Sequence, residues 1–243
     1  LLLELHARAG VRACFAVVGA ASLPGQRPYH DPAQIRRIHE AGHEIASHSQ
    51  QHEYIPSLSS SPLRATLTAS KDALEQCIGA PVTTFVPPYN QPFDYPAAVS
   101  ISLTERRAAP DERTDLPRLC AALREADYRF CRVSYRPAPQ RVAELITRRR
   151  FDRPAFVEQI SGLTCVRLNT PGGFTTQTRR VIDRCAERGG TAVVYGHPHS
   201  VRSGNSQDAR WLVPLLEHVS ALRDAGRIRV VLPRELSGGP GAA

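Results

Sequence analysis

Short apolar runs alternate with longer amphipathic segments along most of the 243 residues, and this alternation limits the possible folds. The apolar runs predict buried strands at 12–19, 43–46, 82–86, 128–134, 165–168, 191–195 and 228–232. Strands that are joined by helices imply a parallel sheet with right-handed crossovers. We therefore predict an α/β fold, either a barrel or a doubly wound sheet.

Helix signals fill the segments between the predicted strands. Asp31 is placed to cap a helix that has Pro32 at its first position and Gly42 just past its end. Further helices are expected at 1–9, 61–77, about 115–126, 139–149, 177–189 and 206–225. The region 136–176 is the least legible part of the chain.

Composition is typical of a soluble globular protein, with 42% hydrophobic and 22% charged residues. No apolar run is long enough to span a membrane. The net charge of +8 comes from arginines scattered over every segment, with one cluster at 148–150, so we do not expect nucleic-acid binding. The six cysteines form no Cys-x-x-Cys pair, which argues against a zinc ribbon or a disulfide framework. Compartment and oligomeric state stay open.

Two histidines follow the predicted strand at 43–46. His48 and His52 stand four residues apart, so one helical turn or a tight loop would place both imidazoles on one side. Imidazole is a good ligand for Zn²⁺ and its neighbours, and three protein ligands with a water form a hydrolytic site. Two histidines are one ligand short of such a site.

Three stretches, each just after a predicted strand, resemble the polysaccharide deacetylases, the NodB-homology or carbohydrate esterase family 4 proteins. They are Gly-His-Glu-Ile-Ala-Ser-His-Ser-Gln-Gln-His at 42–52, Phe-Val-Pro-Pro-Tyr-Asn at 85–90 and Val-Tyr-Gly-His-Pro at 194–198. The resemblance covers nearly the whole chain and is weakest at 100–176. It implies a distorted (β/α) barrel and one deacetylase domain over 1–243.

The resemblance also implies metal-dependent hydrolysis of an N-acetyl, or less often O-acetyl, group on a glycan or amino sugar. In that interpretation His48 and His52 hold Zn²⁺, or Co²⁺ or a similar ion, together with an Asp, while a second Asp acts as base. The backbone N–H of Tyr89 would bind the oxyanion, with Pro88 beside it lining the substrate site. His197 would protonate the leaving amine.

This chain departs from the family pattern at several positions. The two aspartates of the family belong to a first strand that we expect before Leu1, so we predict an N-terminally truncated domain that lacks this strand and is nearly inactive alone. Val86 stands where the family has an Arg, and 133–135 offer no acid to tune the catalytic histidine. Tyr195 stands where Leu is common.

Two rival functions remain open at this stage. Hydrolysis of a small non-peptide amide is favoured by the missing Arg at Val86, and a non-catalytic glycan-binding relative is favoured by the missing acid. Some residues have simpler interpretations: His197 as a turn residue bonded to backbone, and the lone Trp211 as part of a core. Structural or surface roles are assigned to His30, Asp31 and His43.

Overall fold

The computed structural model describes residues 1–26, 29–90, 116–134, 146 and 155–238. The chain divides into two compact units. The sheet unit comprises 14–138, 158–165 and 233–243, and the helical unit comprises 1–13, 139–157 and 166–232. The predicted helix at 139–149 and the arginine cluster at 148–150 lie outside the described residues, apart from Ile146.

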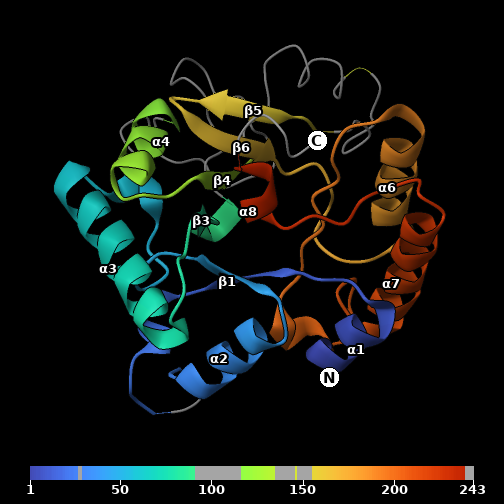
Figure 1. Ribbon diagram of the computed structural model, residues 1–243, viewed down its shortest axis with the longest axis horizontal. Helices are drawn as coiled ribbons and strands as arrows, with labels where there is room; N and C mark the ends of the chain where they lie inside the picture. The colour runs from blue at the N-terminus through green and yellow to red at the C-terminus, as the bar shows by residue number, and fades with distance from the viewer. Residues whose placement is uncertain (27–28, 91–115, 135–145, 147–154, 239–243) are drawn as a thin grey trace. The chain divides into compact units, whose positions relative to one another are not determined.

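Six strands form one sheet in the order β1-β2-β3-β4-β6-β5 (Figure 1). The first four pair in parallel, with Cys14 opposite Glu44, Ser47 opposite Phe85 and Phe85 opposite Cys131. Their bounds are β1 Cys14–Val17, β2 Glu44–Ser47, β3 Thr84–Phe85 and β4 Phe130–Val133, followed by β5 Val157–Ile160 and β6 Leu163–Arg167. The predicted α/β class with a mostly parallel sheet is confirmed.

Three long helices cover the sheet unit: α2 (Pro32–Glu40), α3 (Ser60–Ile78) and α4 (Leu116–Glu125). The predicted cap of α2 is confirmed, because Asp31 accepts a hydrogen bond from the Gln34 amide at 3.1 Å. Gly79 ends α3 in a left-handed conformation, φ +67°. Helices α2 and α3 pack against β2 and against each other (Figure 1). A short α8 (Pro233–Leu236) completes the unit.

A hairpin at β5 and β6 was not predicted from the sequence. Ser161 and Gly162 both have positive φ, which gives the two-residue turn that joins antiparallel strands with the correct twist. The sequence indicated only one strand here, at 165–168. The Ser-Gly turn carries a weaker signal than Asn-Gly or Asp-Gly, and this is why the first strand of the pair was missed.

The helical unit has a separate core, built by α1 (Leu2–Ala9), α6 (Thr176–Arg188) and α7 (Ala209–Asp224). Leu5 and Leu216 are buried in one cluster between α1 and α7. Gly10 ends α1 with φ +60°, and the Arg223 guanidinium donates to the last carbonyl of that helix, Ala9, at 3.1 Å. These contacts join the N-terminal helix to one far along the chain.

Two predicted strands, at 191–195 and 228–232, are absent from the sheet in the part of the chain that is described. Only Thr191 makes a bridge, antiparallel to Ala155. The physical reason is clear for the first segment: Asn169 donates to the Thr191 carbonyl at 2.8 Å and accepts from the Val193 amide at 2.9 Å. Side chains therefore satisfy backbone groups that a neighbouring strand would otherwise bind.

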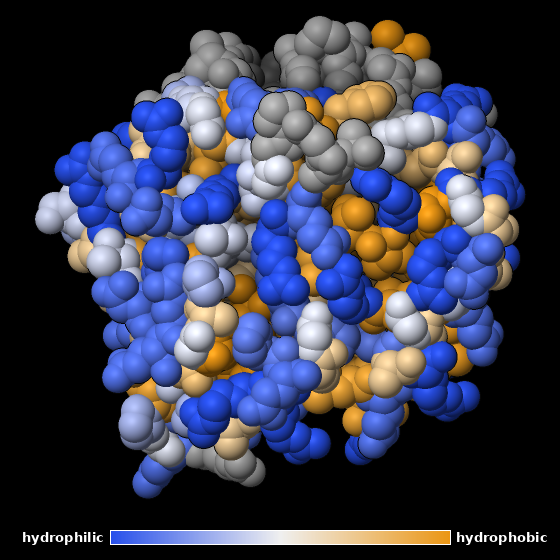
Figure 2. Space-filling model, viewed as in Figure 1, coloured by the Kyte–Doolittle hydropathy of each residue, from blue (hydrophilic) through white to orange (hydrophobic). Residues whose placement is uncertain are grey.

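The surface agrees with the composition. On the face shown in Figure 2, hydrophilic side chains predominate and apolar residues show in small patches between them. Among the described helices, none is long and apolar enough to cross a membrane.

Candidate metal centre

The candidate centre begins where β2 ends. Every residue of β2 is buried, and its last residue, Ser47, contacts the Ser70 hydroxyl of α3 at 2.8 Å between oxygens. The His48 amide donates to the carbonyl of Val17 on β1, and the Val86 amide donates to the carbonyl of Ser47, both at 2.9 Å. Hydrogen bonds to both neighbouring strands thus fix the start of the loop at the carboxyl edge of the sheet, where parallel sheets place their ligands.

The loop from His48 to His52, which we call the histidine loop, is not a helical turn. Ser49 and His52 are both left-handed, with φ of 65° and 61°, and the Ser49 carbonyl accepts from the Gly19 amide at 2.9 Å. Of the two arrangements the spacing allowed, the chain therefore uses the tight loop. Non-glycine residues in this conformation are uncommon and cluster at functional sites.

The two imidazoles face each other edge to face, with ring centroids 4.9 Å apart and planes at 68°. His48 donates from Nδ1 to the Val86 carbonyl at 2.5 Å, which fixes its tautomer and places the lone pair on Nε2. Imidazoles that share one ion at about 2.1 Å per nitrogen have centroids about 5 Å apart. The centroid distance of the pair agrees with this value, and the role of the two residues as metal ligands stays a prediction.

No third ligand joins the pair within the described residues, where no group of three His, Cys, Asp or Glu side chains could hold a metal. Glu53 is adjacent in sequence, but its carboxylate accepts from the Thr66 hydroxyl at 2.7 Å and from the Gln51 amide at 2.8 Å. Burial raises the pKa of Glu53, and hydrogen bonds from nearby hydroxyl and amide groups outweigh burial and hold that pKa below its ordinary value. Glu53 thus fixes the loop, a role that sequence reasoning missed.

Pro88 and Tyr89 lie at the end of β3, on a 3₁₀ turn at Pro88–Asn90. Tyr89 is left-handed, φ 55°, and its side chain is 50% exposed. Its ring centroid lies 4.7 Å from that of His52 and 5.8 Å from that of Tyr54. The structure thus brings the predicted residues 88 and 89 to the imidazole pair.

Arg132 on β4 also reaches this loop, and sequence reasoning missed it. It is 7% exposed, and its guanidinium donates to the Pro87 carbonyl at 2.7 Å and to the Ser134 hydroxyl at 2.5 Å. The pairing of β3 with β4 brings it there, beside the position where Val86 replaces the expected arginine. A charged residue inside the apolar run Phe130–Val133 was the available signal.

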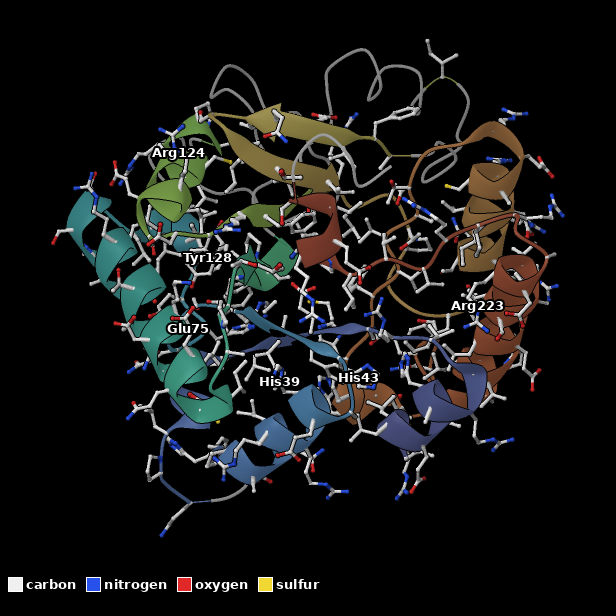
Figure 3. The ribbon with its side chains drawn as sticks, in the orientation of Figure 1. His39, His43, Glu75, Arg124, Tyr128 and Arg223 are labelled. Carbon is white, nitrogen blue, oxygen red and sulfur yellow. The ribbon has the colours of Figure 1, made fainter. Side chains whose placement is uncertain are left out.

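Strand β2, which leads into the loop of His48 and His52, carries a buried carboxyl group. Glu44 is 3% exposed and accepts from the Thr84 hydroxyl at 2.5 Å and the Arg234 amide at 3.1 Å, and burial raises its pKa. His43, labelled in Figure 3, is buried with its ring centroid 5.2 Å from that of Phe15. His43 thus has the structural role that the sequence indicated.

His197 lies in the helical unit, on an exposed turn after Gly196. Its backbone N–H and its Nδ1 both bond to the side-chain oxygen of Gln207, at 2.6 Å and 3.0 Å. This neutral partner orients the imidazole where the family pattern suggested an acid. Gln207 is another residue that the sequence did not indicate, because it is separated from the motif at 194–198.

Comparison with known proteins covers one of the two histidine motifs. The sequence model of the polysaccharide deacetylase family matches residues 2–103, a segment that includes His48, His52, Pro88 and Tyr89. Over this segment the chain is similar to the polysaccharide deacetylase family. His197 lies outside the matched residues.

Two solved deacetylase structures share the fold, and a pseudoenzyme structure is a weaker match. A protein from Mycobacterium smegmatis described as a candidate polysaccharide deacetylase has 18% identity and a TM-score of 0.59, over 92% of this chain and 70% of that one. A peptidoglycan N-acetylglucosamine deacetylase has 12% identity and a TM-score of 0.52, over 98% and 81%. A CE4-family pseudoenzyme from Bacillus anthracis has 13% identity and a TM-score of 0.48, over 93% and 55%.

Proposed function

We propose that this chain acts as a metal-dependent carbohydrate deacetylase, which hydrolyses an N-acetyl or O-acetyl group on a glycan. One observation carries the proposal: two imidazoles whose ring centroids lie 4.9 Å apart, with one ring oriented by a backbone carbonyl. The match of residues 2–103 to the polysaccharide deacetylase family model supports it.

In this proposal His48 and His52 hold the divalent ion, Zn²⁺ or Co²⁺, through their ring nitrogens. When bound, such an ion polarises an acetyl carbonyl and lowers the pKa of a bound water. The Val86 carbonyl keeps the His48 ring in the tautomer that binds metal. The Tyr89 N–H, on a turn held by the buried Pro87 and Pro88, would donate to the oxyanion.

His197 is the proposed proton donor to the leaving amine, on the basis of its motif. Gln207 holds the Nδ1 edge of the ring, so Nε2 is the nitrogen that would transfer the proton. A His197→Ala variant should therefore lower acetate release and leave metal affinity unchanged.

A second candidate function is non-catalytic glycan binding. The described residues supply two metal ligands and no third, and the carboxylate of Glu53, next to His52, is bonded to Thr66 of α3 and to Gln51. For the same reason, turnover by this chain is expected to be low. The alternative of small-amide hydrolysis rested on the arginine that is missing at Val86. The Arg132 guanidinium donates to the carbonyl of the next residue, Pro87, so a guanidinium is present beside this position and the alternative loses its basis.

The test is acetate release from N-acetylglucosamine oligomers, with and without added Zn²⁺ or Co²⁺. We expect slow release that depends on metal, is lost in His52→Ala and persists in His39→Ala, a matched variant on α2. Acetate release that does not depend on added metal, or that persists in His52→Ala, would contradict the proposal. Glycan binding without any acetate release would support the non-catalytic function.

A further inference from the structure

Beside the imidazole pair, the rings of Tyr89 and Tyr54 meet edge to face with their planes at 73°, and we call these two residues the tyrosine wall. We infer that Tyr54 is a specificity-determining residue and that the corner formed by the two rings of the tyrosine wall contacts the apolar face and one edge of a neutral sugar ring. This inference rests on the proposed function, because it places the sugar of the substrate next to the proposed metal ligands.

The tyrosine wall lies next to His52, one of the two proposed metal ligands. The rings of His48, His52, Tyr89 and Tyr54 follow one another edge to face, with successive centroid distances of 4.9, 4.7 and 5.8 Å. Half of the Tyr89 side chain is exposed, so a ligand can reach this ring. A sugar on Tyr89 would carry its acetamido group toward His52.

The backbone holds the wall in place before any ligand arrives. The Tyr54 carbonyl accepts from the Ser57 amide at 3.1 Å and from the Ser57 hydroxyl at 2.8 Å, and the next residue, Ile55, is buried. Tyr89 is fixed on its left-handed turn. Aromatic side chains with few rotatable bonds lose little entropy on binding, and a fixed backbone lowers that cost further.

The chemistry of the wall selects a neutral ring. A tyrosine presents an apolar face with a polar hydroxyl at its edge, which matches a sugar whose C–H groups lie on one face and whose hydroxyls lie on the rim. The carboxylate of Glu53, the residue after His52, accepts hydrogen bonds from Thr66 and Gln51. The one tryptophan, Trp211, has the Arg210 guanidinium 5.6 Å from its ring centroid.

The experiment compares Tyr54→Ala and Tyr54→Phe with Tyr29→Ala, a tyrosine that is 79% exposed and outside the wall. Each protein is titrated with an N-acetylglucosamine tetramer by calorimetry, and separately with Zn²⁺. We expect Tyr54→Ala to weaken glycan binding about three- to tenfold with Zn²⁺ affinity unchanged. Tyr54→Phe keeps the aromatic face and should bind within twofold of the wild type, as should Tyr29→Ala.

Two outcomes would overturn the inference. In the first, Tyr54→Ala binds the tetramer as tightly as the wild type. In the second, Tyr54→Ala loses Zn²⁺ and glycan binding together, which would mean that Tyr54 only supports the loop. Failure of the proposed function is distinguishable, because it would show as absent acetate release or absent Zn²⁺ binding in the wild type, whereas the wall is tested by the ratio of glycan affinities.

Discussion

The two histidine sites of this chain are supported in different ways. His48 and His52 lie on a loop that is bonded to β1, β3 and α3, and a carbonyl from the end of β3 orients one ring. His197 lies on an exposed turn, and the side chain of Gln207 orients it. The first arrangement depends on the sheet, whereas the second depends on one surface side chain.

This difference suits the two proposed roles. A metal ion needs ligands that are held in place before it binds, because a small displacement weakens every bond to the ion. A group that exchanges protons needs access to solvent and to substrate more than it needs a rigid frame. Substitutions that disturb the frame of the first site should therefore weaken metal binding strongly, whereas substitutions around His197 should hardly change it.

The largest effect is expected from Phe85→Ala. Phe85 is fully buried in β3, with its ring 5.7 Å from that of Tyr128, and the next residue, Val86, orients His48. We predict a loss of about 3 to 5 kcal/mol in the free energy of unfolding, measured by urea titration, and weaker metal binding. Leu212→Ala is the matched control, because this buried residue of the helical unit should lower stability but leave metal affinity intact. Equal metal affinity in both variants would contradict the comparison.

Glu53→Ala should have the next largest effect. It removes the acceptor for Thr66 and for the Gln51 amide, both in or against the histidine loop. Allowing for partial exposure, we predict a loss of about 2 kcal/mol in unfolding free energy, again by urea titration. Glu53→Gln keeps a neutral acceptor and should lose less. If the two variants are equally stable, the charge of Glu53 does not hold the loop.

The pH dependence of stability follows from the same carboxylate. Hydrogen bonds hold the folded-state pKa of Glu53 below its unfolded value of about 4.3, so this contribution is present above that pH. It should be lost as the pH falls through the folded-state pKa. Urea titrations between pH 5.5 and pH 3 should therefore show a steeper loss in the wild type than in Glu53→Gln. Parallel curves for the two proteins would show that the folded-state pKa is not lowered.

The smallest effect is expected from Gln207→Ala. Gln207 bonds His197 near the surface, so we predict a loss of less than about 1 kcal/mol in unfolding free energy. The sensitive measurement is the ¹⁵N NMR shift of the imidazole, which should show His197 changing its tautomer balance. Metal affinity should stay at the wild-type value. A large drop in metal affinity would show that the two sites are more closely linked than this account holds.

Much of the fold could be predicted because its signals are local. Each of these signals depends on a few adjacent residues. They are the helix cap at Asp31, the glycines that end helices at Gly10 and Gly79, and the apolar runs of the first four strands. The segment 191–195 was predicted wrongly because its apolar character is that of a strand, while its backbone partner is the Asn169 side chain. Periodicity cannot show which group satisfies a backbone amide.

The residues of the site likewise divide into those with a local sequence signal and those without one. The spacing of His48 and His52 predicted a pair on one side, and the structure confirms that they lie together. The left-handed loop between them has no sequence signal, since neither of its left-handed residues is glycine. Arg132 and Gln207 reach the site loops from distant segments, and contacts of that kind arise only from the folded chain. The role of His197 and a third metal ligand stay predictions.

The most direct test of the central claim is a calorimetric titration of the chain with Zn²⁺, compared with the His48→Ala, His52→Ala double variant and with His197→Ala. The account predicts that the double variant loses at least about 100-fold in affinity, because both nitrogen ligands are gone, while His197→Ala binds as the wild type does. A double variant that binds Zn²⁺ as tightly as the wild type would contradict the account, because the histidine loop would then be a structural turn and not a metal centre.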